Sequence, residues 1–159
     1  MIIDLKNIQR YMRPGQRLLG LDLGTKTIGL AVSDPALRVA SPIHTIKRKK
    51  FIQDLPELLE IIHQYNIGGL IFGWPLNMDG TVSRRCQATN QFALNLGYQG
   101  VELPMAFYDE RLSTVAVERI LINEADMSRK KRSAVVDKMA SGFILQGALE
   151  FLDGLNESS

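Results

Sequence analysis

Residues 20–34 read GLDLGTKTIGLAVSD, and this stretch decides the fold. One acid, Asp22, lies inside an apolar run over 18–23 that otherwise predicts a fully buried β-strand. A glycine-bearing turn over 24–27 and a second apolar strand over 28–33 follow at once. Because burying an unpaired carboxylate costs several kcal/mol, a positive group is expected beside Asp22, and a metal ion is the first candidate.

The pattern then changes from consecutive strands to alternating helices and strands. A third strand is expected over 39–46, which completes an antiparallel meander of three strands. The further expected elements are a helix over 51–65, a strand over 69–73, a helix over 81–96, a strand over 105–108, a helix from Ser113 or Thr114 to 123 and a helix over 133–152. This order predicts an α/β fold whose mixed five-stranded sheet joins the meander to parallel strands and is flanked by helices. Functional groups are then expected at the carboxyl ends of the strands.

Length and turn signals predict how the chain is divided. Its 159 residues suit one domain with a substantial core. Residues 1–16 carry apolar side chains at helical spacing, end at a Pro-Gly break and are interpreted as an N-terminal extension. The domain itself is expected over 17–154, with Gly154 ending the last helix and 155–159 forming a disordered tail.

Composition excludes several kinds of site. The lone Cys86 cannot form an internal disulfide, and the two histidines lack zinc-type spacing. A metal is therefore expected on oxygen ligands, which favours Mg²⁺ or Mn²⁺. No apolar run approaches the roughly 18 residues of a membrane span, and no signal-peptide stretch is recognisable. The protein is expected to be cytoplasmic, without membrane contact.

Positive charge is concentrated rather than general. The net charge is only +2, but residues 47–50 and 129–132 each place four cations in four positions, and Arg84-Arg85 lies between these blocks. One such block alone is usually a solvated face. Together they indicate a polyanionic partner.

Two further acids, Asp109 and Glu110, end a predicted strand. Taken alone, the two acids are typical of a solvated turn whose negative charge stabilises the N-terminus of the following helix. Because neighbours on a strand point to opposite faces, only one of them is expected to face Asp22. Glu110 is the predicted ligand, although the sequence leaves Asp109 open.

A third candidate, Asp137, lies on the last predicted helix among small residues that permit close packing on a sheet. The alternative is a surface acid paired with Lys138 or Lys130. Asp22 also has an alternative role, as acceptor of hydrogen bonds from the 24–27 turn. Three carboxylates on different elements are the minimum set for a two-metal phosphodiesterase, in which ions about 4 Å apart orient the attacking water and stabilise the leaving oxygen.

Other residues suit contacts with a nucleic-acid backbone. The loop over 73–80 leads into a helix N-terminus, where free N–H groups bind phosphate well. The expected nucleic-acid-binding residues are Lys26, Asn77, Arg84, Arg85, Arg111, Lys130 and Lys131.

Four ordered motifs resemble the YqgF/RuvX group of Holliday-junction-resolvase-like proteins. They are the 20–34 stretch, the loop GWPLNMDG over 73–80, DERLST over 109–114, and Asp137 followed by Ala140 and the run Ile144-Leu145-Gln146. The resemblance implies an RNase H-like fold, with catalytic acids at Asp22, at Asp109 or Glu110, and at Asp137.

The resemblance also implies a nuclease that processes the 5′ end of the 16S rRNA precursor in ribosome biogenesis. Ribosomal precursor particles are then expected partners of a monomer or weak dimer. The alternatives are a resolvase of branched DNA and a catalytically inactive nucleic-acid-binding module. An actin-like ATPase shares the Asp22-to-Val32 pattern, but such enzymes use two copies of this kind of domain and the chain has room for one.

Overall fold

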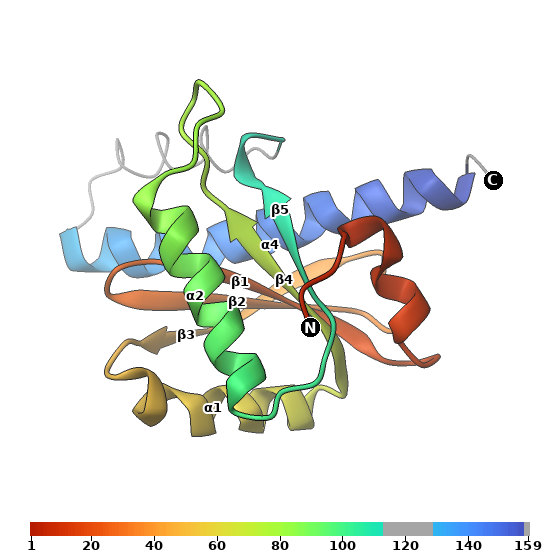
Figure 1. Ribbon diagram of the computed structural model, residues 1–159, viewed down its shortest axis with the longest axis horizontal. Helices are drawn as coiled ribbons and strands as arrows, with labels where there is room; N and C mark the ends of the chain where they lie inside the picture. The colour runs from red at the N-terminus through yellow and green to blue at the C-terminus, as the bar shows by residue number, and fades with distance from the viewer. Residues whose placement is uncertain (113–128, 158–159) are drawn as a thin grey trace.

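A computed structural model describes the backbone of residues 1–112 and 129–157, and the side chains of residues 1–112 and 139–157. The chain alternates strands with helices after an initial three-strand meander (Figure 1). The elements are η1 (Leu5–Tyr11), β1 (Arg17–Leu23), β2 (Thr27–Ser33), β3 (Ala40–Lys47), α1 (Phe51–Gln64), β4 (Ile67–Trp74), α2 (Arg84–Tyr98), β5 (Met105–Asp109), η2 (Glu110–Leu112) and α4 (Arg129–Glu157).

The five strands form one mixed sheet in the order β3-β2-β1-β4-β5. Strands β1, β2 and β3 pair antiparallel, whereas β4 pairs parallel with β1 and β5 pairs parallel with β4. This arrangement confirms the predicted five-stranded α/β fold. The carboxyl ends of β1, β4 and β5 therefore share one edge of the molecule.

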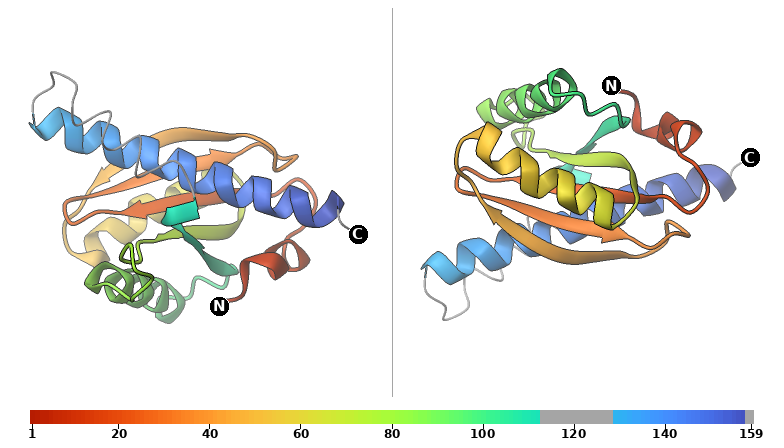
Figure 2. Two further views of the ribbon diagram at one scale, coloured as in Figure 1. Left: turned by 90° about the horizontal axis from the view of Figure 1, so that it is seen from above. Right: turned by 90° about the horizontal axis from the view of Figure 1, so that it is seen from below.

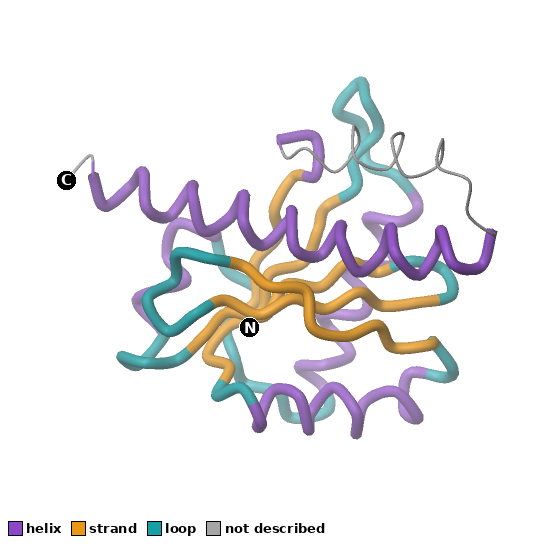
Figure 3. The backbone as a smooth tube through the Cα atoms, turned by 180° about the vertical axis from the view of Figure 1, so that it is seen from behind, coloured by secondary structure: helices purple, strands orange, loops and turns teal. Residues whose placement is uncertain are grey.

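Helices cover both faces of the sheet. Helices α1 and α2 lie on one face, and the long α4 crosses the other, as Figure 2 shows from above and below. Seen from behind, α4 runs in front of the strands along the length of the molecule (Figure 3). Alternation along β1 sends Leu19, Leu21 and Leu23 into the core beneath α1 and α2, whereas Leu18 joins the core beneath α4.

Glycines set how closely α4 approaches the sheet. A Cβ atom at Gly20 of β1 would lie 2.8 Å from Leu145 Cβ and 3.1 Å from the Ser141 carbonyl oxygen. A Cβ atom at Gly73 of β4 would lie 2.6 Å from Ile144 Cδ1. The helix therefore packs directly on the backbone of β1 and β4.

The N-terminal segment completes the edge of the sheet beside β5. Ile3 N donates to Met105 O at 2.8 Å, and Met105 N donates to Met1 O at 2.8 Å. These bonds cover backbone groups that an edge strand would otherwise expose. Leu5 and Ile8 of η1 are buried against the same core as α4. The division at residue 16 into extension and domain stays a prediction.

Three predicted helix boundaries differ from the structure by three residues or more. Helix α2 begins at Arg84 rather than 81, because the Ser83 hydroxyl accepts from Cys86 N at 3.2 Å and caps it. Helix α4 continues to Glu157, so Gly154 does not end it and residues 155–157 are helical rather than a tail. A glycine weakens a helix by only about 1 kcal/mol, and Leu152 anchors this end in the core. At its other end, α4 is already helical at Arg129. The helix predicted from 113 to 123 lies outside the described residues.

Candidate active site

Asp22 is a fully buried carboxylate at the end of β1. It is 0% exposed and pairs in register with Gly29 of β2. Side chains alternate between the two faces along a strand, so Asp22 points to the same face as Leu18 and Gly20. That face is the one covered by α4. The following turn is closed by a main-chain bond from Gly24 N to Thr27 O at 2.8 Å.

Glu110 lies on the same face as Asp22. It directly follows β5, is 9% exposed, and its Oε1 atom would be only 2.7 Å from a Cβ atom at Gly73. In the parallel ladder Leu21 pairs with Phe72, so the next residues, Asp22 and Gly73, are neighbours on β1 and β4. The Glu110 carboxylate therefore lies over the strand beside Asp22, at the shared carboxyl-terminal edge.

Asp109 has a different environment. By alternation along β5, Asp109 points to the same face as Phe107, which packs with the core beneath α1 and α2. Tyr108, between them, packs in the core beneath α4. Arg111 Nε donates to Asp109 Oδ1 at 3.1 Å and Arg111 Nη2 donates to Oδ2 at 2.8 Å. This bidentate pair lowers the pKa of Asp109 below its ordinary value. The sequence left open which of these two neighbouring acids faces Asp22. In the structure, Glu110 lies on the Asp22 face, whereas Asp109 pairs with Arg111.

Asp137 is placed only through its backbone. It lies on α4 one helical turn before Ser141, whose carbonyl packs against Gly20. Its side chain lies outside the described residues, as do those of Lys130 and Lys131 on the first turn of the helix. Among the side chains that are described, which do not include that of Asp137, no three His, Cys, Asp or Glu residues gather to hold a metal.

The loop between β4 and α2 is organised by its own side chains. Asp79 Oδ1 accepts from Thr81 N at 2.9 Å and from Thr81 Oγ1 at 2.7 Å, which lowers the pKa of Asp79. Asn77 Nδ2 donates to Thr81 Oγ1 at 2.9 Å. A Cβ atom at Gly80 would lie 3.4 Å from Arg111 Nη1. Asn77 and Arg111, both expected at nucleic acid, therefore already have contacts within the loop region.

The remaining expected cations divide into exposed and anchored side chains. Lys26 and Arg84 are exposed. Arg85 is half-buried, and its Nη2 atom donates to Leu23 O at 3.0 Å. Arg48, which was expected only as one cation of the basic block over 47–50, donates from Nη1 to Gly24 O at 2.6 Å.

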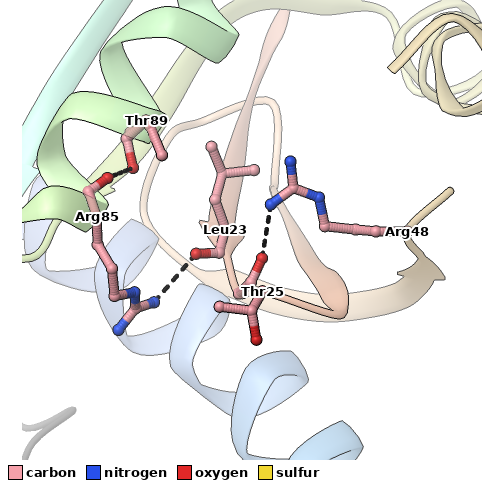
Figure 4. A pocket seen from close by; sticks show the side chains of 7 residues that line it. Leu23, Thr25, Arg48, Arg85 and Thr89 are labelled. Carbon is pink, nitrogen blue, oxygen red and sulfur yellow. Dashed lines mark hydrogen bonds between the residues drawn. The ribbon is translucent and has the colours of Figure 1, made fainter. Parts of the chain in front are cut away.

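Arg48 and Arg85 meet at a pocket beside the end of β1 (Figure 4). The pocket is lined by Leu23, Gly24, Thr25, Arg48, Arg85, Ala88 and Thr89. The sequence offered one signal for Arg48. It directly follows the third strand of an antiparallel meander, and the end of that strand lies beside the start of the second strand, next to the 24–27 turn. The separation of 62 residues between Leu23 and Arg85 carried no such signal.

A sequence model described as "RuvX: Holliday junction resolvase" matches residues 16–151. The chain therefore belongs to the RuvX family. Among RuvX relatives, the chain is 48% identical over 154 residues to a protein of Phenylobacterium zucineum, covering 97% of this chain and 99% of that one. It is 56% identical over 134 residues to a protein of Roseobacter denitrificans, covering 84% and 82%. Both relatives carry the name "Putative pre-16S rRNA nuclease".

The RuvX chain also shares its fold with a solved structure of RuvC. Thermus thermophilus RuvC in complex with a Holliday junction substrate superposes with a TM-score of 0.53 at 15% identity, covering 87% of this chain and 96% of RuvC. This similarity confirms the RNase H-like fold expected for the RuvX family. In the described part of the RuvX chain, no helix is both long and apolar enough to cross a membrane.

Proposed function

We propose that this chain is a metal-dependent endonuclease that processes the 5′ end of the 16S rRNA precursor. The observation that carries the proposal is the position of Asp22 and Glu110, two buried acids on one face of the sheet, at the ends of β1 and β5 on either side of β4. The choice of the 16S rRNA precursor as substrate is supported by the names of the relatives, which match most of the chain. The protein is proposed to act in the cytoplasm as a monomer or weak dimer, with ribosomal precursor particles as its partners.

The proposed metal ligands are Asp22, Glu110 and Asp137, with Mg²⁺ or Mn²⁺ as the ion. The donor set fits these hard cations, because all three side chains offer carboxylate oxygens. Two carboxylates buried on the same face of the sheet repel each other, and a cation between them would relieve that repulsion. Asp137 is included because its helix packs on Gly20, two residues before Asp22 on the same face of β1.

A divalent cation would supply an activated water and would neutralise the charge that develops on the phosphate. The protein's own part is to hold the reacting groups in place. Asp22 is fixed by its strand pairing, and Gly73 leaves the space that the Glu110 carboxylate occupies. Exposed cations such as Lys26 and Arg84 would bind the nucleic-acid backbone without reading its sequence.

The test is cleavage of a labelled 16S precursor 5′-leader RNA with Mg²⁺ or Mn²⁺. The wild-type protein is expected to cut, and Asp22→Asn is expected to bind the RNA without cutting it. Asp153→Asn, which makes the same chemical change at an exposed position on α4, should cut like wild type. Binding without cutting by all three proteins would favour a catalytically inactive binding module.

A second candidate function is resolution of four-way DNA junctions. The description of the matching family favours it. A synthetic four-way junction assayed beside the RNA separates the two substrates. Faster metal-dependent cutting of the junction than of the leader RNA would replace the proposed substrate with branched DNA.

A further inference from the structure

Two half-buried arginines line one pocket at the end of β1, on either side of Leu23 in Figure 4. Arg48 comes from the segment between β3 and α1, and Arg85 comes from the first turn of α2. They donate to the carbonyl oxygens of consecutive residues, Gly24 and Leu23. The fold therefore brings two positive charges to one point of the backbone from distant parts of the chain.

Neither guanidinium has an acidic partner in the part of the chain that the structure describes. The ion pairs found there join other residues, and the described contacts of Arg48 and Arg85 are carbonyl oxygens and an aromatic ring. Arg48 Cζ lies 5.8 Å from the centroid of the Phe92 ring. Two partly desolvated charges of the same sign near one pocket favour an anion that enters from solvent.

The anchoring bonds leave most of the donors of both arginines available. A guanidinium carries five N–H donors, and each of these side chains uses one on a carbonyl. Thr25, whose side chain is exposed, adds a hydroxyl at the same rim. Planar donors held in fixed positions are suited to phosphate oxygens.

The pocket adjoins the proposed catalytic acids from the other side of the strand. Leu23 follows Asp22 directly, and the two side chains point to opposite faces of the sheet. A nucleic-acid strand that crosses the end of β1 would therefore pass both the carboxylates and the arginine pair.

We propose that Arg48 and Arg85 together bind one backbone phosphodiester of the substrate strand, beside the position that is cut. This inference rests on the proposed nuclease function for the identity of its ligand. It deepens that function by assigning a phosphate site built from two arginines with backbone-anchored side chains.

The first test is RNA binding measured without catalysis. Fluorescence anisotropy of the labelled leader RNA in EDTA reports affinity at several salt concentrations. Arg85→Gln is expected to weaken binding about tenfold at low salt. The slope of log affinity against log salt should fall by about 0.7, the value for one lost single-strand phosphate contact. Arg10→Gln, at an exposed arginine on η1 that does not line the pocket, should change neither quantity.

A second pair of variants keeps both arginines and tests the charge of the pocket. Ala88 lines the pocket and is exposed on α2, so a longer side chain there does not disturb the core. Ala88→Glu would place a carboxylate beside the guanidinium groups and should weaken binding far more than Ala88→Gln. Thermal melting of each variant shows whether it is folded.

The outcomes separate this inference from the proposed nuclease function. Wild-type affinity and salt slope in both Arg85→Gln and Ala88→Glu would overturn the phosphate site, even if the protein cuts RNA. The binding assay does not need cleavage, so an inactive protein that loses RNA affinity in these variants would support the site and contradict the nuclease. Binding that requires a 5′-terminal phosphate on the RNA would overturn the backbone assignment, because the site would then hold a chain end.

Discussion

The Glu110 carboxylate occupies the space that a side chain at Gly73 would fill. A Cβ atom at residue 73 would lie 2.7 Å from Glu110 Oε1 and 2.6 Å from Ile144 Cδ1. The absence of a side chain on β4 therefore allows an acid from the end of β5 and a residue of α4 to meet on the same strand. This relationship joins the packing of the helix to the geometry of the proposed site.

Gly73→Ala should damage both stability and cleavage. The added methyl must displace Ile144 and Glu110, and overpacking of this kind costs about 1–3 kcal/mol. Urea unfolding measures the loss, and the RNA assay should show slower cutting. Gly97→Ala is the matched control, because a Cβ atom there meets nothing within 4 Å and alanine favours the helix. Equal stability of the two variants would contradict the close packing at Gly73.

Glu110→Gln and Asp109→Asn should have unequal effects on cutting. Loss of a metal-holding carboxylate at Glu110 should reduce the cleavage rate by a factor on the order of 100 or more. Asp109→Asn removes the bidentate partner of Arg111 and should leave most of the rate. Single-turnover cleavage of the leader RNA measures both variants. A larger loss in Asp109→Asn would assign the ligand to the other acid.

The Asp109–Arg111 pair should make stability depend on acid pH. The pKa of Asp109 is lower in the folded protein than its ordinary value, chiefly because Arg111 hydrogen-bonds to it. A lowered folded-state pKa stabilises the protein above the unfolded pKa, near 3.9, and this stabilisation is lost as the pH falls through the folded pKa.

The free energy of unfolding of Asp109→Asn should therefore lie below that of wild type at pH 7, by about 1 kcal/mol or less for a partly exposed pair. The difference should shrink below about pH 4. Urea unfolding at pH 7 and pH 3 measures it. Asp153→Asn, which has no ion pair within the described residues, serves as the control. A difference that is the same at both pH values would rule out the ionic contribution.

Divalent metal should stabilise the wild-type protein through Asp22. A ligand at 100 times its dissociation constant stabilises the folded state by about 2.7 kcal/mol. For a domain of this size the midpoint of thermal unfolding would rise by about 5–10 °C. Mn²⁺ should produce this rise in wild type and little of it in Asp22→Asn, and EDTA should reverse it. An equal rise in both proteins would place the metal elsewhere.

Ile8→Ala should destabilise the whole domain, although Ile8 lies in the predicted extension. The side chain is 0% exposed and packs in the core beneath α4. Truncation of a fully buried isoleucine costs about 2–5 kcal/mol. Urea unfolding should show a single shifted transition. Loss of less than about 1 kcal/mol would mean that residues 1–16 are an addition to a domain that is stable without them.

Much of the fold was predictable because its signals are local. Alternating or continuous apolar runs predicted all five strands, and the tight 24–27 turn predicted that the first two pair antiparallel. The importance of Asp22 was also local, because a carboxylate in an apolar strand is costly wherever the strand lies. Helix ends were less predictable: Gly154 suggested a stop, but burial of Leu152 holds the last turns in place.

By itself, then, the sequence determined the strands, their order of appearance and the acid inside the first of them, since each depends on residues that are neighbours in the chain. Only the tertiary structure decided that Glu110 lies on the Asp22 face while Asp109 pairs with Arg111. It also decided that Arg48 and Arg85 meet at Leu23 and Gly24. These relationships depend on which strand lies beside β1 and on how closely two helices approach the sheet. Such contacts between distant segments follow from the packing of the whole core, which no short stretch of sequence specifies.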